Sequence, residues 1–154
     1  MKHRNRIAFR AICLAALATL LFGGCGGGGN YADGIYTAQS EVYDGLEDEE
    51  NLEGGDGYGV VTITLKDNVI VDCSFTTYMI DGTAKGPDYG KKNGEISNRD
   101  YYNKAQRAVL ASQKYAEQLT AAGSLDGVDA ISGATISYQE FREAVKAALK
   151  QARE

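Results

Sequence analysis

The clearest alternation of hydrophobic and polar positions lies in the middle of the chain, in YGVVTITLKDNVIVDCSFTTY. Apolar residues alternate with polar ones on both sides of the turn residues KDN. The first alternation runs through Val61, Ile63 and Leu65, and the second through Val69, Val71, Cys73 and Phe75. Because successive side chains of a strand point to opposite faces, this pattern predicts a β-hairpin with one buried face. Cys73 falls on that face, which favours a buried thiol over a reactive one.

The remaining periodic segments predict one further strand and two helices. Strand formers dominate GIYTAQSEV, residues 34–42. A helical stripe in RDYYNKAQRAVLASQKYAEQLTAAG comprises Tyr101, Ala105, Ala108, Ser112, Tyr115 and Leu119, with Gly123 as the stop. We interpret its tyrosines as core packing. The last helix, from about Ser137, has the apolar face Phe141, Ala144, Val145, Ala148 and Leu149.

This order of elements predicts an α+β domain. A small antiparallel sheet, made of a strand plus a hairpin, would pack one face against the helices. The C-terminal helix would follow the turn SGATIS.

Two segments show neither the alternation of a strand nor the 3.6-residue period of a helix. The segment 41–56 carries eight acids, but it lacks the spacing and turn glycine of an EF-hand, so it predicts a solvated acidic loop. The segment 79–98 contains the only proline and many turn-forming residues, which predicts a long loop. A loop of this length in a compact domain is usually functional or disordered.

The N-terminus predicts a signal peptide over residues 1–24, with a cationic start, an apolar run of 12 residues at 11–22 and a small-residue cleavage point. That run is too short for a membrane span, which takes about 20 apolar residues. Cys25 follows Gly23 and Gly24, so the segment resembles a bacterial lipoprotein signal, although Phe22 stands where leucine is usual. The alternative is a plain signal peptide with an incidental cysteine. Residues 25–33 would then be a lipidated cysteine and a glycine-rich tether to a domain at 34–154.

Removal of this signal would change the charge and the reactive groups. The mature chain of 130 residues would keep 12 Lys+Arg against 21 Asp+Glu, a net charge of −9, which argues against nucleic acid as a partner. Cys73 would be the only thiol inside the fold, so no internal disulfide is expected. His3, the only histidine, would also be lost. We therefore see no acid–base or nucleophilic cluster, and we expect a carrier more than a turnover enzyme.

The junction before the last helix, DAISGATISYQEF, carries the hydroxyls of Thr135 and Ser137. Ser137 and Glu140 have the spacing of a capping box, in which the serine accepts from the third helical amide and the glutamate reaches back to the cap. On spacing alone, this structural role is favoured over chemistry.

The run DAISGATIS resembles the flavinylation motif of the FMN-binding domain family. In that family an acid and a small Ser/Thr-Gly-Ala-Thr/Ser core precede the Thr or Ser that is joined to FMN by a phosphoester bond. The match consists of Asp129 as the acid, Ser132, Gly133, Ala134 and Thr135 as the core, Ile136 as the free position and Ser137 as the acceptor. Serine replaces the threonine of many members. The resemblance, to the small lipoprotein branch, spans nearly all of residues 31–154.

The resemblance implies FMN as the cofactor, attached by a separate Mg-dependent FAD:protein FMN transferase, with Asp129 aiding recognition. A phosphate at a helix N-terminus would meet unpaired amides and the positive end of the dipole. Candidates for contact with the ring are Tyr78, Met79, Tyr89 and Tyr101. Few cations are expected near the ring, which would lower its reduction potential.

Together these features predict a flavoprotein that is lipid-anchored to the cell membrane through Cys25 and faces the periplasm or the extracellular side. It would carry electrons from a membrane donor to an extracytoplasmic acceptor. Two alternatives stay open: a cofactor-free surface lipoprotein that binds a partner or ligand, and a flavin-dependent reductase of a small exported substrate.

Overall fold

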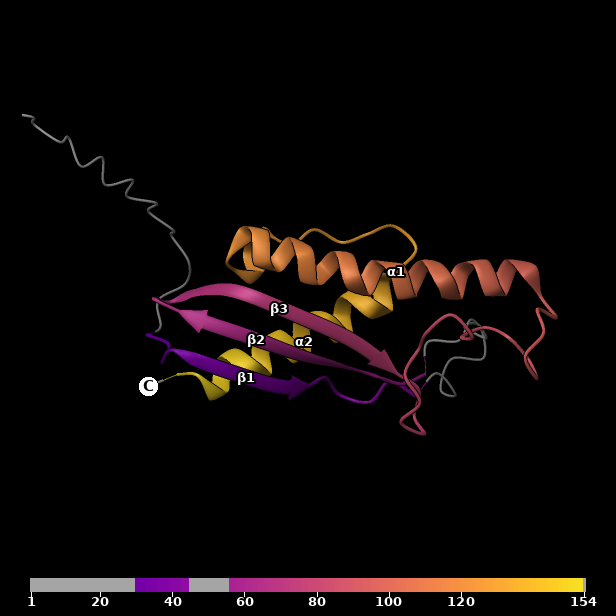
Figure 1. Ribbon diagram of the computed structural model, residues 1–154, viewed down its shortest axis with the longest axis horizontal. Coiled ribbons are helices and arrows are strands. Elements are labelled where there is room, and N and C mark those ends of the chain that lie inside the picture. The colour runs from indigo at the N-terminus through magenta and orange to yellow at the C-terminus, as the bar shows by residue number, and fades with distance from the viewer. Residues whose placement is uncertain (1–29, 45–55, 154) are drawn as a thin grey trace, which may run out of the picture.

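The structure is a computed structural model that describes residues 30–44 and 56–153. Its elements are β1 Gly34–Gln39, β2 Tyr58–Lys66, β3 Val69–Tyr78, α1 Arg99–Ala122, the 3₁₀ turn η2 Leu125–Gly127 and α2 Thr135–Gln151 (Figure 1). The predicted α+β class and the C-terminal helix are confirmed. The predicted signal peptide, Cys25, the glycines of the tether and the centre of the acidic loop lie outside the described residues.

The three strands form one antiparallel sheet in the order β1-β2-β3. The predicted hairpin is confirmed as β2 and β3. Asp67 and Asn68 connect them with φ values of 51° and 63°. Positive φ at both central residues matches the right-handed twist of the flanking strands, and Asp and Asn tolerate it better than most residues.

The predicted buried face is right for β2 but wrong for the first half of β3. Ile63 pairs with Cys73, but Leu65 pairs with Ile70, so Val71 is an extra residue in β3. This bulge reverses the alternation, because one inserted residue turns every side chain before it to the other face. Ile70 is therefore buried, whereas Val69 and Val71 are 45% and 44% exposed.

The first strand ends at Gln39, three residues before the predicted end. The Ser40 hydroxyl there accepts from the Gly59 amide at 2.9 Å, and Tyr43 and Gly57 exchange two backbone hydrogen bonds of 2.7 and 2.8 Å. These bonds hold the two ends of the acidic segment together.

The folded domain begins before the predicted Gly34. The Ala32 amide donates to the Ala152 carbonyl at 2.8 Å, and Tyr31 forms a bridge with Arg153. Residues 31–33, which the sequence placed in the tether, therefore belong to the fold, and they join the N-terminal strand to the end of α2.

Both helices cover the same face of the sheet, α1 over β3 and α2 over β1 and β2 (Figure 1). Asn98 caps α1 by accepting from the Tyr101 amide at 3.0 Å, and Gly123, with φ of 70°, ends the helix as predicted. The core joins the two layers; its largest fully buried side chains are Tyr115, Phe141, Ile63, Leu119, Val61 and Val145. Of the predicted apolar positions, Leu149, Tyr101 and Ala108 are only partly buried.

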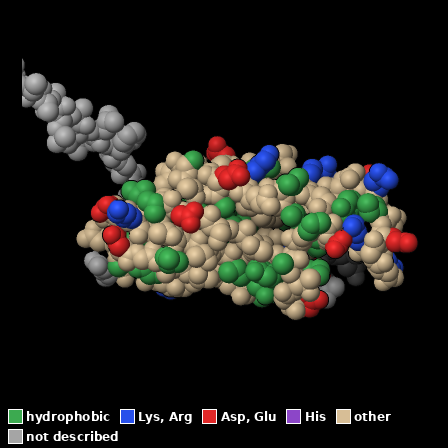
Figure 2. All heavy atoms as spheres, viewed as in Figure 1, with side chains coloured by type: hydrophobic (Ala, Val, Ile, Leu, Met, Phe, Trp, Pro, Cys, Tyr) green, Lys and Arg blue, Asp and Glu red, His purple; other side chains and the backbone are tan. Residues whose placement is uncertain are grey.

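Among the described residues no helix covers the opposite face of the sheet, which is mainly polar. Figure 2 shows this side, where hydrophobic side chains are scattered among polar atoms. Thr37 and Thr62 pair across β1 and β2 through their hydroxyls at 2.9 Å. Within residues 30–44 and 56–153, no helix has the length and apolarity needed to span a membrane.

Tyr115 connects α1 to the start of α2. Its side chain is fully buried, and its ring lies 5.3 Å from Tyr138 and 5.5 Å from Phe141, centre to centre. Its hydroxyl accepts from the Ile131 amide at 3.1 Å and donates to the Ala134 carbonyl at 3.2 Å. One phenol therefore satisfies two backbone groups of the turn that leads into α2.

We expect Tyr115→Phe to keep the core packing and remove both hydrogen bonds. The free energy of unfolding should fall by about 1–3 kcal/mol, because the Ile131 amide loses its acceptor and the Ala134 carbonyl loses one of its two donors. Urea denaturation measures this change. The matched control is Tyr102→Phe, which removes an exposed hydroxyl bonded to the Pro87 carbonyl at 3.1 Å and should cost less than about 0.5 kcal/mol. An equal decrease in the free energy of unfolding in the two variants would contradict the role given to Tyr115.

Candidate functional site

The site is built on the turn that precedes α2. The Ala134 amide donates to the Ile131 carbonyl at 3.1 Å, which closes a β-turn. Its third residue, Gly133, has φ of 79°, a conformation that glycine adopts without penalty. Ala134 is then the N-cap of α2, and its carbonyl accepts the first helical bond from Tyr138 at 3.0 Å.

The capping box predicted for Ser137 and Glu140 is wrong. The helix begins at Thr135, so Ser137 is its third residue and not its cap. The glycine turn and the Tyr115 hydroxyl fix Ala134 at the boundary, three residues before a serine cap at Ser137 would place it. Ala134 makes no side-chain cap hydrogen bond, and the first amides of a helix have no partner within the helix, so those of α2 could donate to another acceptor.

A cavity of about 360 Å³ opens at this uncapped helix end. Its walls come from the α2 start, from α1, from the segment after β3 and from the ends of the sheet. The lining residues are Tyr43, Thr77, Lys85, Tyr89, Tyr101, Lys104, Ala105, Ala108, Val109, Gly133, Ala134, Thr135, Ile136 and Ser137. Thr135 is exposed, whereas Ser137 is only 7% exposed and reaches the cavity from within the helix.

The long segment 79–98 is held against this cavity. The Lys85 amide donates to the Thr77 carbonyl at 2.8 Å, as a further rung beside the end of β3. From α1, the Gln106 amide group donates to the carbonyls of Gly86 at 3.1 Å and Tyr89 at 2.8 Å. The predicted loop is therefore ordered by its neighbours, and it contributes two side chains to the cavity wall.

Those two side chains, Lys85 and Tyr89, lie in contact. The Lys85 ammonium is 5.2 Å from the centre of the Tyr89 ring. Burial lowers the pKa of Lys85, and the charges of Glu140 and Asp56 oppose that shift. Burial also raises the pKa of Tyr89, so its phenol is neutral in the working range. Lys104 is a second cation in the wall, and the expectation of few cations near the site is therefore wrong.

Glu140 lies one turn after Ser137 on α2 and is only 3% exposed. Neither of its carboxylate oxygens has a hydrogen-bond partner within the described part of the chain. Burial raises the pKa of Glu140 to about 7; Lys85 opposes this shift and Glu143 adds to it. An unpartnered carboxyl next to a cavity is costly to bury as an anion, which makes it unusual in a structural role.

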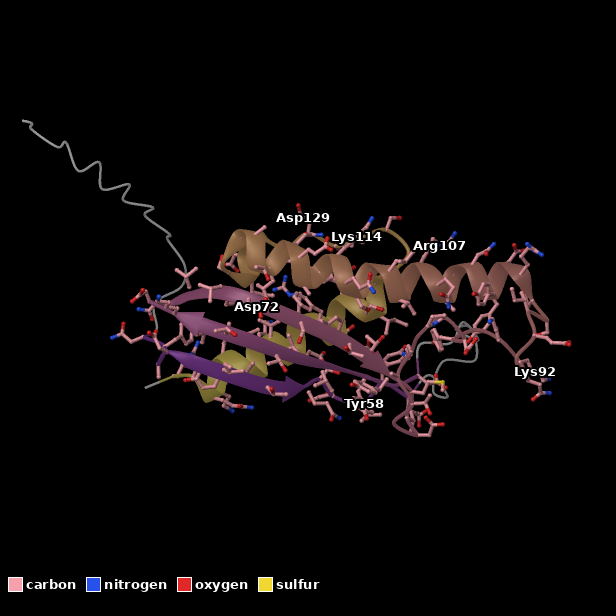
Figure 3. All side chains as sticks on the ribbon, in the orientation of Figure 1. Tyr58, Asp72, Lys92, Arg107, Lys114 and Asp129 are labelled. Atoms are coloured by element: carbon pink, nitrogen blue, oxygen red, sulfur yellow. The ribbon has the colours of Figure 1, made fainter. Side chains whose placement is uncertain are left out.

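The structure brings four of the six predicted cofactor-binding residues to the cavity: Gly133, Ala134, Thr135 and Ser137. Ser132 and Asp129 are exposed and do not line it. The Asp129 amide donates to the Gln118 side chain at 2.8 Å. Figure 3 shows Asp129 at the outer edge of the molecule beside α1.

Two of the four predicted ring contacts, Tyr89 and Tyr101, line the cavity. Tyr78 and Met79 do not. Tyr78 instead stacks on Tyr58 across the hairpin, with ring centres 5.4 Å apart.

The sequence pattern did not identify Lys85, Lys104 or Glu140 as residues of the site. A signal existed for Glu140, since it shares the helical stripe of Ser137, Phe141 and Ala144, and an acid on a buried stripe breaks the amphipathic pattern. No comparable signal marked the lysines, because a loop lysine and a helix lysine reach this cavity only through the tertiary fold.

Cys73 is partly buried, and burial, followed by the nearby Asp72 charge, raises the pKa of its thiol to about 12. The prediction of an unreactive thiol is thus supported by its surroundings. In the described ranges, no three His, Cys, Asp or Glu side chains are grouped so that they could hold a metal ion.

Comparison with known proteins is consistent with this geometry. The model of the FMN-binding domain matches residues 54–150. The crystal structure of CPE2226 protein from Clostridium perfringens resembles the chain with a TM-score of 0.53 and 18% identity, over 80% of this chain and 89% of that one. This likeness supports the fold alone, and no curated protein gives a significant match. The family match covers most of the chain, including the turn, nearly all of α2 and every residue of the cavity wall except Tyr43, so the chain belongs to the FMN-binding domain family and is a flavin-binding protein with FMN as its cofactor.

Proposed function

We propose that this protein is a membrane-tethered electron carrier whose FMN is joined through a phosphoester bond to the Ser137 hydroxyl. The observation that carries the proposal is the uncapped N-terminus of α2, which opens into the cavity beside that hydroxyl. First-turn amides and the positive end of a helix dipole favour a phosphate group at such a position.

The residues around the helix end fit the phosphate end of FMN. A Cβ added at Gly133 would meet no atom within 4 Å, so open space lies in front of the turn. Thr135 and Ser137 add hydroxyls to the same wall, and the lysines supply positive charge. These are the donor types that phosphate groups use in proteins.

The rest of the cavity fits a planar aromatic group. Tyr89 and Tyr101 offer ring faces or edges, and Ala105, Ala108 and Val109 form an apolar wall along α1. The volume of about 360 Å³ lies within the range of small-molecule sites, roughly 300–1,000 Å³. When bound, the isoalloxazine ring would supply the electron-transfer chemistry, and the protein would supply position and electrostatics.

The carrier function is supported by what the cavity wall offers: aromatic and apolar surface, hydroxyls and positive charge, which suit the binding and positioning of FMN. The alternatives make different predictions: a cofactor-free lipoprotein would never acquire FMN, whereas a reductase would have its flavin spectrum bleached and restored by one small substrate.

The attachment is tested by the intact mass of the protein produced together with an FAD:protein FMN transferase. We expect a mass increment equal to FMN that is lost in Ser137→Ala, because the acceptor oxygen is removed. Thr135→Ala is the matched control, since Thr135 lines the same cavity two residues earlier. It should keep the increment. An unmodified wild-type protein, or loss of the increment in Thr135→Ala alone, would contradict the proposed linkage.

The tether is tested separately at Cys25. In a bacterial host that lipidates exported proteins, the wild-type chain should fractionate with membranes and carry a lipid on its N-terminal cysteine. Cys25→Ser should remove both properties and leave FMN attachment unchanged, because residue 25 precedes the folded domain. Membrane fractionation and mass spectrometry measure this outcome, and a soluble, unlipidated wild-type protein would overturn the tether.

A further inference from the structure

Glu140 occupies a position that the fold has made room for. It points from α2 toward the sheet, where a Cβ added at Gly59 of β2 would lie 3.2 Å from the Glu140 Cβ and 2.5 Å from the Phe75 ring. Only glycine at position 59 leaves this space. The carboxyl thus sits between α2 and the sheet, 3% exposed and without a hydrogen-bond partner in the described residues.

The positive charge of Lys85, which also lines the cavity, acts on Glu140 and favours its ionised form. The backbone of Lys85 is fixed to Thr77, and its ammonium lies over the Tyr89 ring. A lysine held in this way interacts electrostatically with the buried Glu140 carboxyl and with any negative charge inside the cavity. It therefore couples the two places electrostatically.

Other titratable groups among the described residues act on Glu140 or on Lys85. Asp56, before β2, acts on Lys85, whereas Tyr89, in the segment after β3, and Glu143, on α2 itself, interact with Glu140. From α1, Tyr101 and Lys104 face the cavity. Gly59 of the sheet faces the Glu140 Cβ and the Phe75 ring, and neither Gly59 nor Phe75 can share a charge.

We propose that Glu140 is the proton acceptor coupled to reduction of the cofactor, and that Lys85 links the two. This inference rests on the function proposed above. In the oxidised protein, Lys85 favours the ionised carboxylate. Negative charge added in the cavity would attract the Lys85 ammonium, which weakens its interaction with Glu140, and would also repel the Glu140 carboxylate. Both effects raise the proton affinity of Glu140.

The charges balance for a two-electron reduction. Two electrons come from the donor of the carrier function, here replaced by dithionite. One proton from solvent is taken up by the flavin ring and a second by a Glu140 oxygen, which forms an O–H bond. Lys85 keeps its proton throughout. Oxidation by the acceptor would reverse these steps and return both protons to solvent.

The first measurement needs no flavin. Carboxyl ¹³C NMR of the unloaded protein, with the Glu140 signal assigned by its absence in Glu140→Gln, should show titration near neutral pH, about 7. Lys85→Met should shift this titration to higher pH, because it removes the compensating charge. Titration of Glu140 near the ordinary value of about 4.3 would overturn the proposal.

The second measurement uses the FMN-loaded protein, with loading verified by mass. Proton uptake on reduction is followed with an indicator dye in weak buffer. At about pH 8 the wild-type protein should take up as much as about one proton more per electron pair than Glu140→Gln. At about pH 5 the difference should vanish, because Glu140 is then protonated in both states. The midpoint potential should fall correspondingly more steeply with pH in the wild type.

Glu143→Gln is the control for loss of a nearby acid, since it keeps the buried carboxyl and removes a carboxyl one turn away on the same helix. Because Glu143 raises the pKa of Glu140, this variant should lower that pKa, but at about pH 8 it should still take up more protons per electron pair than Glu140→Gln. Equal uptake by the loaded wild type and Glu140→Gln would overturn the coupling and leave the proposed function standing. A wild-type protein that never acquires FMN would instead overturn the proposed function, and the coupling with it.

Discussion

The arrangement of the site depends on one buried hydroxyl, that of Tyr115. It satisfies an amide and a carbonyl of the turn 131–134, and its ring packs against two aromatic residues of α2. A turn with buried backbone groups needs a partner for each of them. Because that partner stands on α1, the start of α2 is fixed relative to α1, and the cavity between them has a defined wall.

The same constraint leaves the N-terminus of α2 without a side-chain cap. Helix ends are normally satisfied by a Ser, Thr, Asp or Asn at the boundary, but here Ala134 occupies that position. A helix start without a side-chain cap is an energetic cost in the protein alone, and an anion at the helix end would offset it. Glu140 adds a carboxyl that has no hydrogen-bond partner among the described residues. Two such costs within six residues of one helix indicate a region shaped for a ligand more than for stability.

Local patterns predicted the elements well where a single period governs them. The hairpin, the Gly123 stop and the apolar face of α2 follow from alternation, from a positive φ and from a period of 3.6 residues. The errors have identifiable causes. Val71 enters β3 as a bulge, which no alternation rule can locate, and so Ile70 is buried where Val69 and Val71 were expected. Ser137 and Glu140 matched a capping box in spacing, yet contacts from α1 moved the helix start to Thr135.

The sequence by itself determined the class of fold, the motif DAISGATIS and, through it, the family and its cofactor. These depend on short-range order along the chain, which residue types at fixed spacing specify. Only the tertiary structure decided which residues share the cavity with that motif. Lys85, Lys104 and Tyr89 come from two other segments, and Glu140 receives its altered proton affinity from burial against Gly59 and from the lysine across the wall. The pKa of a side chain depends on its distance to other charges and on solvent exclusion in three dimensions, so the sequence pattern alone could not predict the pKa of Glu140.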